Sequence, residues 1–229
     1  MKIDEPEHNL YKEFVNAAEK FPTKKALGIR TKLKITHELQ PDGKLIKKYL
    51  QSREYHWKNF QEVVDNINYL SNGFLSLGLN SNDNIVINAE TRPEWFMSAM
   101  ACFRIKVPIV TLYDTLGLEA LEFGIKQTDT KFLIISGEQI QKVEEILDKL
   151  ETVTNIIVIC DEFYKDKCKT FKENTAKHNI HVQTYDEVIE IGKTSDTIEA
   201  YERPKQDDLA IVMYTSGSTG NPKGMFKAI

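Results

Sequence analysis

The stretch that decides the fold is Asp208–Gly224, which reads DLAIVMYTSGSTGNPKG. It begins with an apolar run that ends at Tyr214 and continues into a segment rich in Gly, Ser and Thr. A short apolar run bounded by such residues predicts a buried strand. Glycine has no Cβ atom, so backbone amides in a glycine-rich turn can converge on an anion. The stretch therefore predicts a strand that leads directly into a phosphate-binding loop.

The predicted loop combines backbone amides, neutral hydroxyl donors and one mobile positive charge. Charge-assisted hydrogen bonds contribute about 1.5–3 kcal/mol each, so several of them would hold a triphosphate in position. The candidate phosphate-binding residues are Thr215, Ser216, Gly217, Ser218, Thr219, Gly220 and Lys223.

Two common nucleotide-binding patterns do not fit this loop. The pattern G-x-x-x-x-G-K-[ST], counted from Gly217, needs glycine at position 222 and a hydroxyl residue at position 224. The chain has Pro222 and Gly224 there, which disfavours a P-loop ATPase or kinase. The dinucleotide pattern G-x-G-x-x-G does not fit either. The alternative is an ordinary surface loop without a ligand. This combination of residues after an apolar strand is uncommon in ordinary surface loops.

The rest of the chain predicts an α/β fold. From Asn59 onward, amphipathic helical patterns alternate with short apolar runs such as Asn84–Asn88, Phe132–Ser136 and Ile156–Cys160. Strands that alternate with helices form crossover units. Strands without polar alternation fit a parallel sheet that is covered on both faces. We therefore expect a mostly parallel sheet with flanking helices.

Local signals predict where several helices begin and end. Thr91 with Glu94, and Ser136 with Gln139, have the spacing of capping boxes, so helices are expected to start there. The apolar positions between residues 140 and 150 recur at helical spacing and predict one continuous helix.

Residues 1–55 are expected to form a preamble of one helix and a small hairpin. The helix covers about His8–Lys20. The hairpin joins Leu33–Leu39 to Leu45–Leu50 through the turn Gln40–Lys44. Proline in that turn presets one dihedral angle, and Gly43 accepts a positive φ.

Composition and charge narrow the range of partners. The 229 residues are 41% hydrophobic and 28% charged, with a net charge of −4, which gives no electrostatic argument for nucleic acid. The N-terminus does not resemble a secretory signal, and the longest aliphatic run is far shorter than the ~20 residues of a membrane span. The cysteines (Cys102, Cys160 and Cys168) and the five histidines show no metal-ligand spacing. An odd, sparse cysteine count fits a reducing compartment.

The loop resembles the signature loop of adenylate-forming (AMP-binding) enzymes, which include acyl-CoA synthetases, luciferases and peptide-synthetase adenylation domains. Three further segments resemble long-chain acyl-CoA synthetases: Glu90–Phe96 (ETRPEWF), Leu112–Gly117 (LYDTLG) and the strand residues Tyr55-x-Trp57. The resemblance runs from about Tyr55 to Gly224. Its LYDTLG segment favours the long-chain subfamily.

Many residues in these three segments can have purely structural roles, without contact to a substrate. Trp57, Trp95 and Phe96 are expected in the core. Thr115 is expected to cap a helix, and Asp114 to lie in a turn. Both nevertheless follow a predicted strand, and open α/β sheets bind ligands where strands end.

The resemblance implies a two-step reaction. A fatty acid carboxylate attacks the α-phosphate of ATP, giving acyl-adenylate and diphosphate, and the thiol of CoA then displaces AMP. The resemblance implies that Thr215 to Thr219 and Lys223 hold the β- and γ-phosphates, and that the Thr215 hydroxyl is a Mg²⁺ ligand. It also implies a cytoplasmic protein with peripheral contact to endoplasmic reticulum or peroxisomal membranes.

The resemblance further implies that the chain holds only part of the fold. The family's adenine-binding aromatic segment, its magnesium-binding Glu, its ribose-binding Asp and its small C-terminal domain all follow the loop. We therefore expect residues 56–229 to form an incomplete AMP-binding N-terminal domain of a fatty acid–CoA ligase, inactive alone. The alternatives are a non-catalytic protein with a relic nucleotide-binding loop, and another adenylate-forming enzyme.

Overall fold

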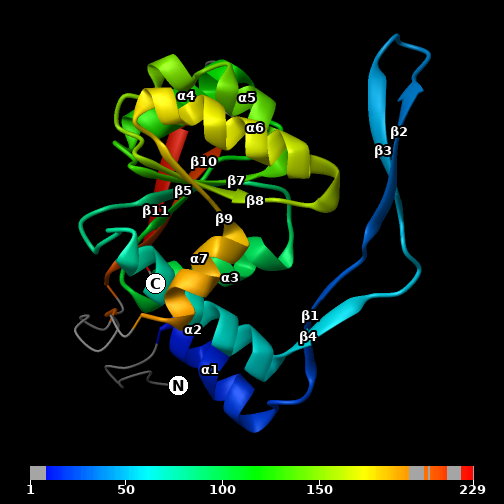
Figure 1. Cartoon of the computed structure of the whole chain (residues 1–229). Coiled ribbons are helices and arrows are strands. Elements are labelled where there is room, and N and C mark those ends of the chain that lie inside the picture. Colours follow the sequence, from blue (N-terminus) through cyan, green and yellow to red (C-terminus); the bar gives the residue numbers. More distant parts are fainter. Residues whose placement is uncertain (1–8, 196–203, 206, 216–222, 229) are drawn as a thin grey trace.

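The computed structural model of the protein describes residues 9–195, 204–205, 207–215 and 223–228, and is built around one large sheet (Figure 1). The sheet has seven strands in the order β11-β10-β6-β5-β7-β8-β9. The strands are β5 (Ile85–Asn88), β6 (Ile109–Thr111), β7 (Phe132–Ser136), β8 (Asn155–Ile159), β9 (His181–Thr184), β10 (Leu209–Thr215) and β11 (Lys223–Ala228). All pair in parallel except β11, which runs antiparallel to β10 at one edge. The predicted parallel sheet is confirmed, whereas β11 was not predicted.

Helices cover both faces of this sheet (Figure 1). On one face lie α2 (Phe60–Ser76), α3 (Pro93–Arg104) and α7 (Tyr185–Lys193), with α1 (Leu10–Lys20) packed on α2 and α3. On the other face lie α4 (Leu118–Gln127), α5 (Ile140–Glu144) and α6 (Lys165–Thr175). Successive strand residues therefore enter different cores: Ile85 and Ile87 pack on the first face and Val86 on the second. This explains why the strands read as unbroken apolar runs.

Two predicted capping boxes are wrong. Helix α3 starts one residue later than expected, since Pro93 occupies its first turn and Arg92 its N-cap position. Glu94 accepts a hydrogen bond from the Arg92 side chain instead of reaching back to Thr91. At the second site, no side-chain capping bond from Ser136 is present among the described residues.

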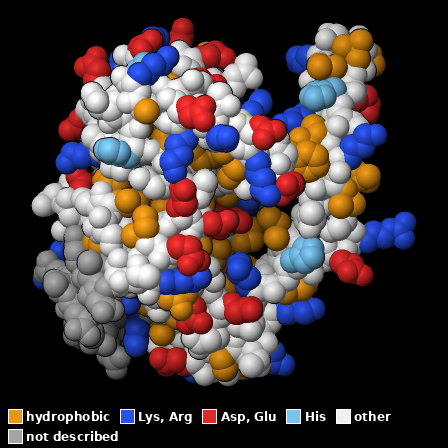
Figure 2. All heavy atoms as spheres, in the orientation of Figure 1, with side chains coloured by type: hydrophobic (Ala, Val, Ile, Leu, Met, Phe, Trp, Pro, Cys, Tyr) orange, Lys and Arg blue, Asp and Glu red, His pale blue; other side chains and the backbone are white. Residues whose placement is uncertain are grey.

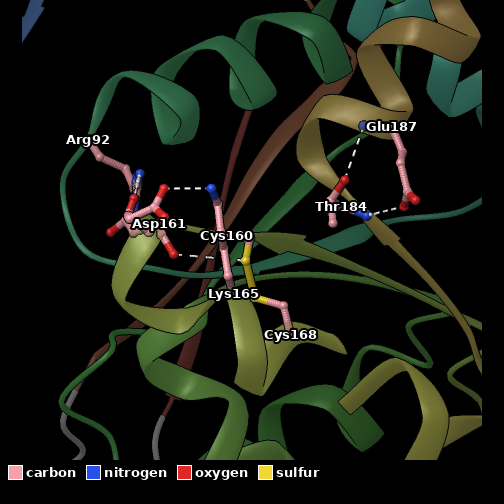
Figure 3. The surroundings of a disulfide bond; sticks show 8 residues. Arg92, Cys160, Asp161, Lys165, Cys168, Thr184 and Glu187 are labelled. Atoms are coloured by element: carbon pink, nitrogen blue, oxygen red, sulfur yellow. Dashed lines mark hydrogen bonds and ion pairs between the residues drawn. A yellow bond between two sulfur atoms is a disulfide. The ribbon is translucent and has the colours of Figure 1, made fainter. Parts of the chain in front are cut away.

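Capping boxes occur at two other helix starts. In α2, Asn59 and Glu62 exchange side-chain and backbone hydrogen bonds of 2.9 and 2.7 Å. In α7, Thr184 and Glu187 do the same, as Figure 3 shows. Each box satisfies backbone amides that the first helical turn leaves without intrahelical partners.

The helix expected over residues 140–150 is interrupted. Helix α5 ends at Glu144, and a single 3-10 turn, η2 (Leu147–Lys149), follows it. The apolar side chains Ile146, Leu147 and Leu150 are still buried, so the helical spacing correctly indicated burial but not helix continuity. The other 3-10 turns are η1 (Gly137–Gln139), η3 (Glu162–Tyr164) and η4 (Ala176–His178).

The segment between α1 and α2 projects from the rest of the molecule as a long two-stranded extension (Figure 1). Its base is an antiparallel ribbon of β1 (Lys25–Ile29) and β4 (His56–Asn59), and its outer part is the hairpin of β2 (Lys32–Leu39) and β3 (Leu45–Gln51). Gly43 in the turn has φ of 83°, so the predicted hairpin and its turn are confirmed. The division at residue 55 into two domains stays a prediction. No helix among the described residues is long and apolar enough to cross a membrane.

Candidate functional site

The carboxyl ends of β5, β6 and β10 meet at one edge of the sheet. After β5 the chain turns into α3 on one face, and after β6 it turns into α4 on the opposite face. Open α/β sheets bind ligands in the crevice formed where adjacent strands diverge in this way. A cavity of about 320 Å³ lies at this position.

Apolar side chains make up much of the cavity wall. Ile87 comes from β5, Trp95 from α3, and Ile211 and Met213 from β10. Trp95 and Phe96 also pack against the core on that face, as predicted. The wall is thus shared by elements that lie more than 100 residues apart in the chain.

Polar groups enter the cavity from the ends of β5 and β6: Glu90, Thr91, Thr111 and Asp114. Thr111 is 7% exposed, and its hydroxyl oxygen has no hydrogen-bond partner within the described residues. Buried polar atoms normally have a partner, so this hydroxyl is available to a ligand or a water molecule. Thr111 was not among the predicted site residues. A polar residue at the end of an apolar strand was its sequence signal.

Two side chains fix the loop that follows β6. The Asn88 amide donates to the carbonyl oxygens of Leu112 and Tyr113 at 3.0 and 3.1 Å. Lys142 of α5 donates to the carbonyl oxygens of Asp114 and Leu116. The LYDTLG segment is therefore held from both sides at the cavity rim.

The predicted cap of α4 is wrong, whereas the predicted turn is confirmed. Asp114 and Thr115 both lie in a turn, and Gly117 occupies the N-cap position of α4. Thr115 is too far from the first helical residue, Leu118, to cap it.

An ionic cluster borders the cavity at Glu90. The Arg92 side chain, 5% exposed, donates to Glu94 at 2.8 Å, to Asp161 at 2.8 Å and to Glu90 at 3.1 Å. Lys32 of the hairpin pairs with Glu90 at 3.2 Å and with Asp161 at 3.1 Å. Figure 3 shows Arg92 facing Asp161. The cluster therefore joins the hairpin, the loop after β5 and the loop after β8.

Mutual pairing keeps these groups charged. Burial alone would raise the pKa of Asp161, but the hydrogen bond and charge of Arg92, together with Lys32, hold that pKa below its usual value. Burial also opposes ionisation of Glu90, but the charge of Arg92, together with hydrogen bonds to the carboxylate and the charge of Lys32, outweighs burial and lowers the Glu90 pKa. The pKa of Arg92 is raised because Glu94 and Asp161 outweigh its desolvation.

The predicted phosphate loop leaves the sheet at the same edge. Thr215 at the end of β10 and Lys223 at the start of β11 are cross-strand partners. The two ends of the loop therefore lie together, beyond the cavity residue Met213 on the same strand. The remaining predicted residues lie outside the described part of the chain: Ser216, Gly217, Ser218, Thr219 and Gly220.

A profile of the family described as "AMP-binding enzyme" matches residues 33–226. The chain belongs to the AMP-binding enzyme family. It is 32% identical to the long chain acyl-CoA synthetase 8 of Arabidopsis thaliana, over 93% of this chain and 29% of that protein. It is also 32% identical to the human long-chain-fatty-acid–CoA ligase 6, over 74% of this chain and 24% of that protein. The chain thus spans about a quarter to a third of these curated relatives.

Solved structures of adenylate-forming enzymes share the fold. The adenylation domain of a carboxylate reductase from Mycobacterium chelonae superposes with a TM-score of 0.80 at 17% identity, over 98% of this chain and 35% of that one. A long-chain-fatty-acid–CoA ligase from Archaeoglobus fulgidus gives a TM-score of 0.67 at 20% identity, over 97% of this chain and 37% of that one. The predicted resemblance to adenylate-forming enzymes is confirmed.

The first residue of the AMP-binding signature, Tyr214, has a structural role. Its ring is buried, and its hydroxyl donates to Gln127 at the end of α4 at 2.6 Å. Burial raises the pKa of Tyr214. Tyr214 thereby fixes the point at which the chain enters the loop.

The structure differs from the sequence-based predictions at Trp57 and at two of the cysteines. Trp57 was expected in the core, but its side chain is 45% exposed on the β1–β4 ribbon at the base of the extension. Cys160, which follows β8, forms a disulfide with Cys168 of α6 (Figure 3), a pairing for which the sequence offered no spacing signal. Cys102 is a buried free thiol, and burial raises its pKa.

Proposed function

We propose that this chain is the amino-terminal part of an ATP-dependent fatty acid–CoA ligase. The reaction converts fatty acid, ATP and CoA into acyl-CoA, AMP and diphosphate through an acyl-adenylate. One observation carries the proposal: the ends of the signature loop, Thr215 and Lys223, lie together at the carboxyl edge of the sheet beside a partly apolar cavity. The names of the curated relatives support the substrate class.

The loop supplies positioning and charge stabilisation, which is what attack by a weak carboxylate nucleophile requires. Residues Thr215 to Gly220 and Lys223 hold the β- and γ-phosphates. Mg²⁺ prefers hard oxygen ligands, and the Thr215 hydroxyl with phosphate oxygens fits that preference. When bound, Mg²⁺ neutralises phosphate charge.

The charges at the cavity rim indicate which part of the substrates binds at the loop and which part binds in the cavity. Glu90 and Asp114 place carboxyl groups in the cavity wall, and these disfavour a polyphosphate there. The phosphates therefore belong at the loop. The apolar wall of Ile87, Ile211 and Met213 suits an uncharged part of the substrate.

The cellular location follows from the resemblance alone. We propose a cytoplasmic enzyme in peripheral contact with endoplasmic reticulum or peroxisomal membranes. Fractionation of cells that express the longer polypeptide would test this location.

Substitutions in a longer polypeptide that contains this chain test the reaction. Lys223→Ala and Thr215→Ala should each weaken Mg–ATP binding and fatty-acid-dependent ATP–diphosphate exchange by about 10- to 100-fold, since each removes a charge-assisted contact. Lys169→Ala, an exposed residue on α6, is the control. Unchanged exchange and unchanged ATP affinity in both loop variants would exclude the proposed role of the loop. These results would favour the alternative of a non-catalytic protein with a relic nucleotide-binding loop.

A further inference from the structure

The charge of the chain is distributed unevenly. Residues 24–58, which we call the arm, include ten Lys or Arg and three Asp or Glu, a net charge of +7. The whole chain has a net charge of −4, so the residues outside the arm carry −11. The arm consists of the β1–β4 ribbon and the β2–β3 hairpin, which stands apart from the body in Figure 1.

The arm also exposes large apolar side chains. Among the described residues, eight of the fourteen exposed large apolar side chains belong to it, although it is less than a sixth of the chain. Leu39 and Leu45 near the tip are 68% and 63% exposed, and Leu50 is 58% exposed. Figure 2 shows hydrophobic atoms interspersed with Lys and Arg along the projecting hairpin. Exposed apolar groups at this density mark an interaction surface.

The inward face of the hairpin is attached to the body. Lys47 donates to Glu138 at 2.7 Å and to the hydroxyl of Tyr164 at 2.6 Å, and the Tyr49 hydroxyl donates to Glu138. Lys32 joins the ionic cluster at Asp161. These contacts hold the hairpin in one orientation, so its opposite face points consistently away from the body.

On that outward face the side chains of β3 alternate aliphatic and cationic groups, whereas β2 contributes one cation, one hydroxyl and Glu38, which pairs with Lys48. Side chains alternate between the two faces of a strand, so the pairs on either side of Lys47 and Tyr49 point outward. The outward cross-strand pairs are Lys34 with Leu50, Thr36 with Lys48, and Glu38 with Ile46, and all six residues are exposed.

The base of the arm adds aromatic rings with nearby cations. The rings of Tyr55 and Trp57 lie 5.4 Å apart. Lys25 lies 5.2 Å from the Trp57 ring, and Arg30 lies 5.5 Å from the Tyr55 ring. Half-exposed Trp and Tyr beside Lys and Arg are typical of surfaces that contact the membrane–water interface.

We propose that the arm binds the surface of an anionic lipid bilayer. Aliphatic side chains would enter the headgroup boundary while Lys and Arg pair with lipid phosphates and carboxylates. The residues outside the arm, with a net charge of −11, are repelled by the same surface, so the arm faces the bilayer and the body faces away. Nucleic acid is a poorer match, because it offers nothing to the outward aliphatic side chains Ile46 and Leu50.

Vesicle sedimentation of the 229-residue chain tests this surface without any nucleotide, so its result is separate from that of the proposed ligase reaction. Binding to phosphatidylcholine vesicles that contain phosphatidylserine should exceed binding to phosphatidylcholine alone by at least about tenfold, and it should weaken as salt rises. Each Lys near an anionic surface changes partitioning by about fivefold. Lys34→Glu combined with Lys48→Glu should therefore weaken binding at least about tenfold.

Two further variants separate the arm from other surfaces. Ile46→Ser combined with Leu50→Ser should also weaken binding to anionic vesicles, because it removes apolar contacts without changing charge. Lys169→Glu combined with Lys177→Glu makes the same charge change on an exposed part of the body and should leave most binding intact. Thermal unfolding of each variant checks that the fold is preserved, and all four arm side chains are exposed.

Three results would overturn the proposal. The first is equal binding to neutral and anionic vesicles. The second is an equal loss of binding in the arm and body charge variants, which would show that any basic surface suffices. The third is a lipid-free dimer, seen by analytical ultracentrifugation, that dissociates in the Ile46→Ser, Leu50→Ser variant while vesicle binding persists. That result would assign the surface to contact between two copies of the chain.

Discussion

Arg92 is the residue through which the cavity rim is joined to the rest of the fold. Its guanidinium pairs with carboxylates before, after and far from it in sequence: Glu90, Glu94 and Asp161. A planar guanidinium can serve several carboxylates at once, which an ammonium group does less well. The exposed fraction of its side chain is 5%, so desolvation is tolerated only because these partners are present.

Arg92→Met should lower the free energy of unfolding by about 3–5 kcal/mol, because it leaves Glu90 and Asp161 partly buried without their main partner. Urea unfolding at neutral pH measures the change. Lys165→Met is the matched control, since Lys165 pairs with Glu162 on the surface at 64% and 80% exposure. The control should show no measurable change. Equal stability of Arg92→Met and the unmodified chain would show that the cluster is energetically neutral.

The same cluster predicts how stability depends on pH. The pKa values of Asp161 and Glu90 are lower in the folded chain than in the unfolded one, so the unfolded chain binds more protons in acid. Their contribution is complete above the unfolded values near pH 4 and is lost as pH falls through the lower folded values. Urea unfolding between pH 7 and pH 3 should show a shallower acid loss in Arg92→Met than in the unmodified chain. If the free energy of unfolding fell equally with pH in both proteins, the lowered pKa values of Asp161 and Glu90 would not depend on Arg92.

At the scale of elements, apolar periodicity predicted most of the fold because burial on two faces determines it. The strands β5, β7 and β8 were recognised as short apolar runs, and each is buried along its whole length. Helix starts were harder, because the spacing of a capping box occurs by chance. Asn59 with Glu62 has the same kind of spacing as Thr91 with Glu94, yet only tertiary contacts show that Glu94 is engaged by Arg92.

The candidate site was predicted only where it is local in sequence. The signature loop was recognised from a run of consecutive residues. Thr111 and Asn88 were missed because their role depends on strand order, which places β5 beside β6 and brings β10, about 100 residues later, next to β6. The sequence marks each of them only as a polar residue at the end of an apolar strand, and it does not encode which strands are neighbours.

The contact between α2 and α7 depends on two glycines. A Cβ atom at Gly192 would lie 1.7 Å from the Tyr69 carbonyl oxygen, and one at Gly73 would lie 2.3 Å from the Val188 carbonyl oxygen. These helices can approach so closely only because neither position has a side chain. The contact holds α7 on the face that also carries α3.

Gly192→Ala should therefore destabilise the chain by at least about 1–3 kcal/mol, the usual cost of overpacking, even though alanine favours helix more than glycine does. The free energy of urea unfolding is the measurement. Lys193→Ala, on the solvent side of the same helix, should leave it nearly unchanged. A stabilised Gly192→Ala variant would mean that α7 lies further from α2 than described.

At the scale of the whole molecule, the two sides of the sheet differ in how completely they are covered. The strands β5, β7 and β8 are buried on both faces along their whole length, whereas one face of β10 is only partly covered. Val212 and Tyr214 are buried, while on the other face Ile211 is half-buried and Leu209 and Met213 are 36% and 39% exposed. The open face of β10 is also the face that borders the cavity. The chain spans about a third of its relatives, and the side of the sheet that holds the candidate site is the less covered one.

The isolated 229-residue chain should bind a hydrophobic dye and show no fatty-acid-dependent ATP–diphosphate exchange. Dye binding is expected because an exposed strand face and an open cavity offer apolar surface to small molecules. Exchange is not expected because the chain spans only about a third of its relatives, and the resemblance places the segments that hold adenine and ribose after the loop. Leu209→Ser combined with Met213→Ser should reduce dye fluorescence, whereas the Ile46→Ser, Leu50→Ser arm variant should retain most of it. Two results would contradict this prediction. One is strong ATP–diphosphate exchange by the isolated chain. The other is a monomer that unfolds cooperatively and does not bind the dye, which would show that the face of β10 is already covered.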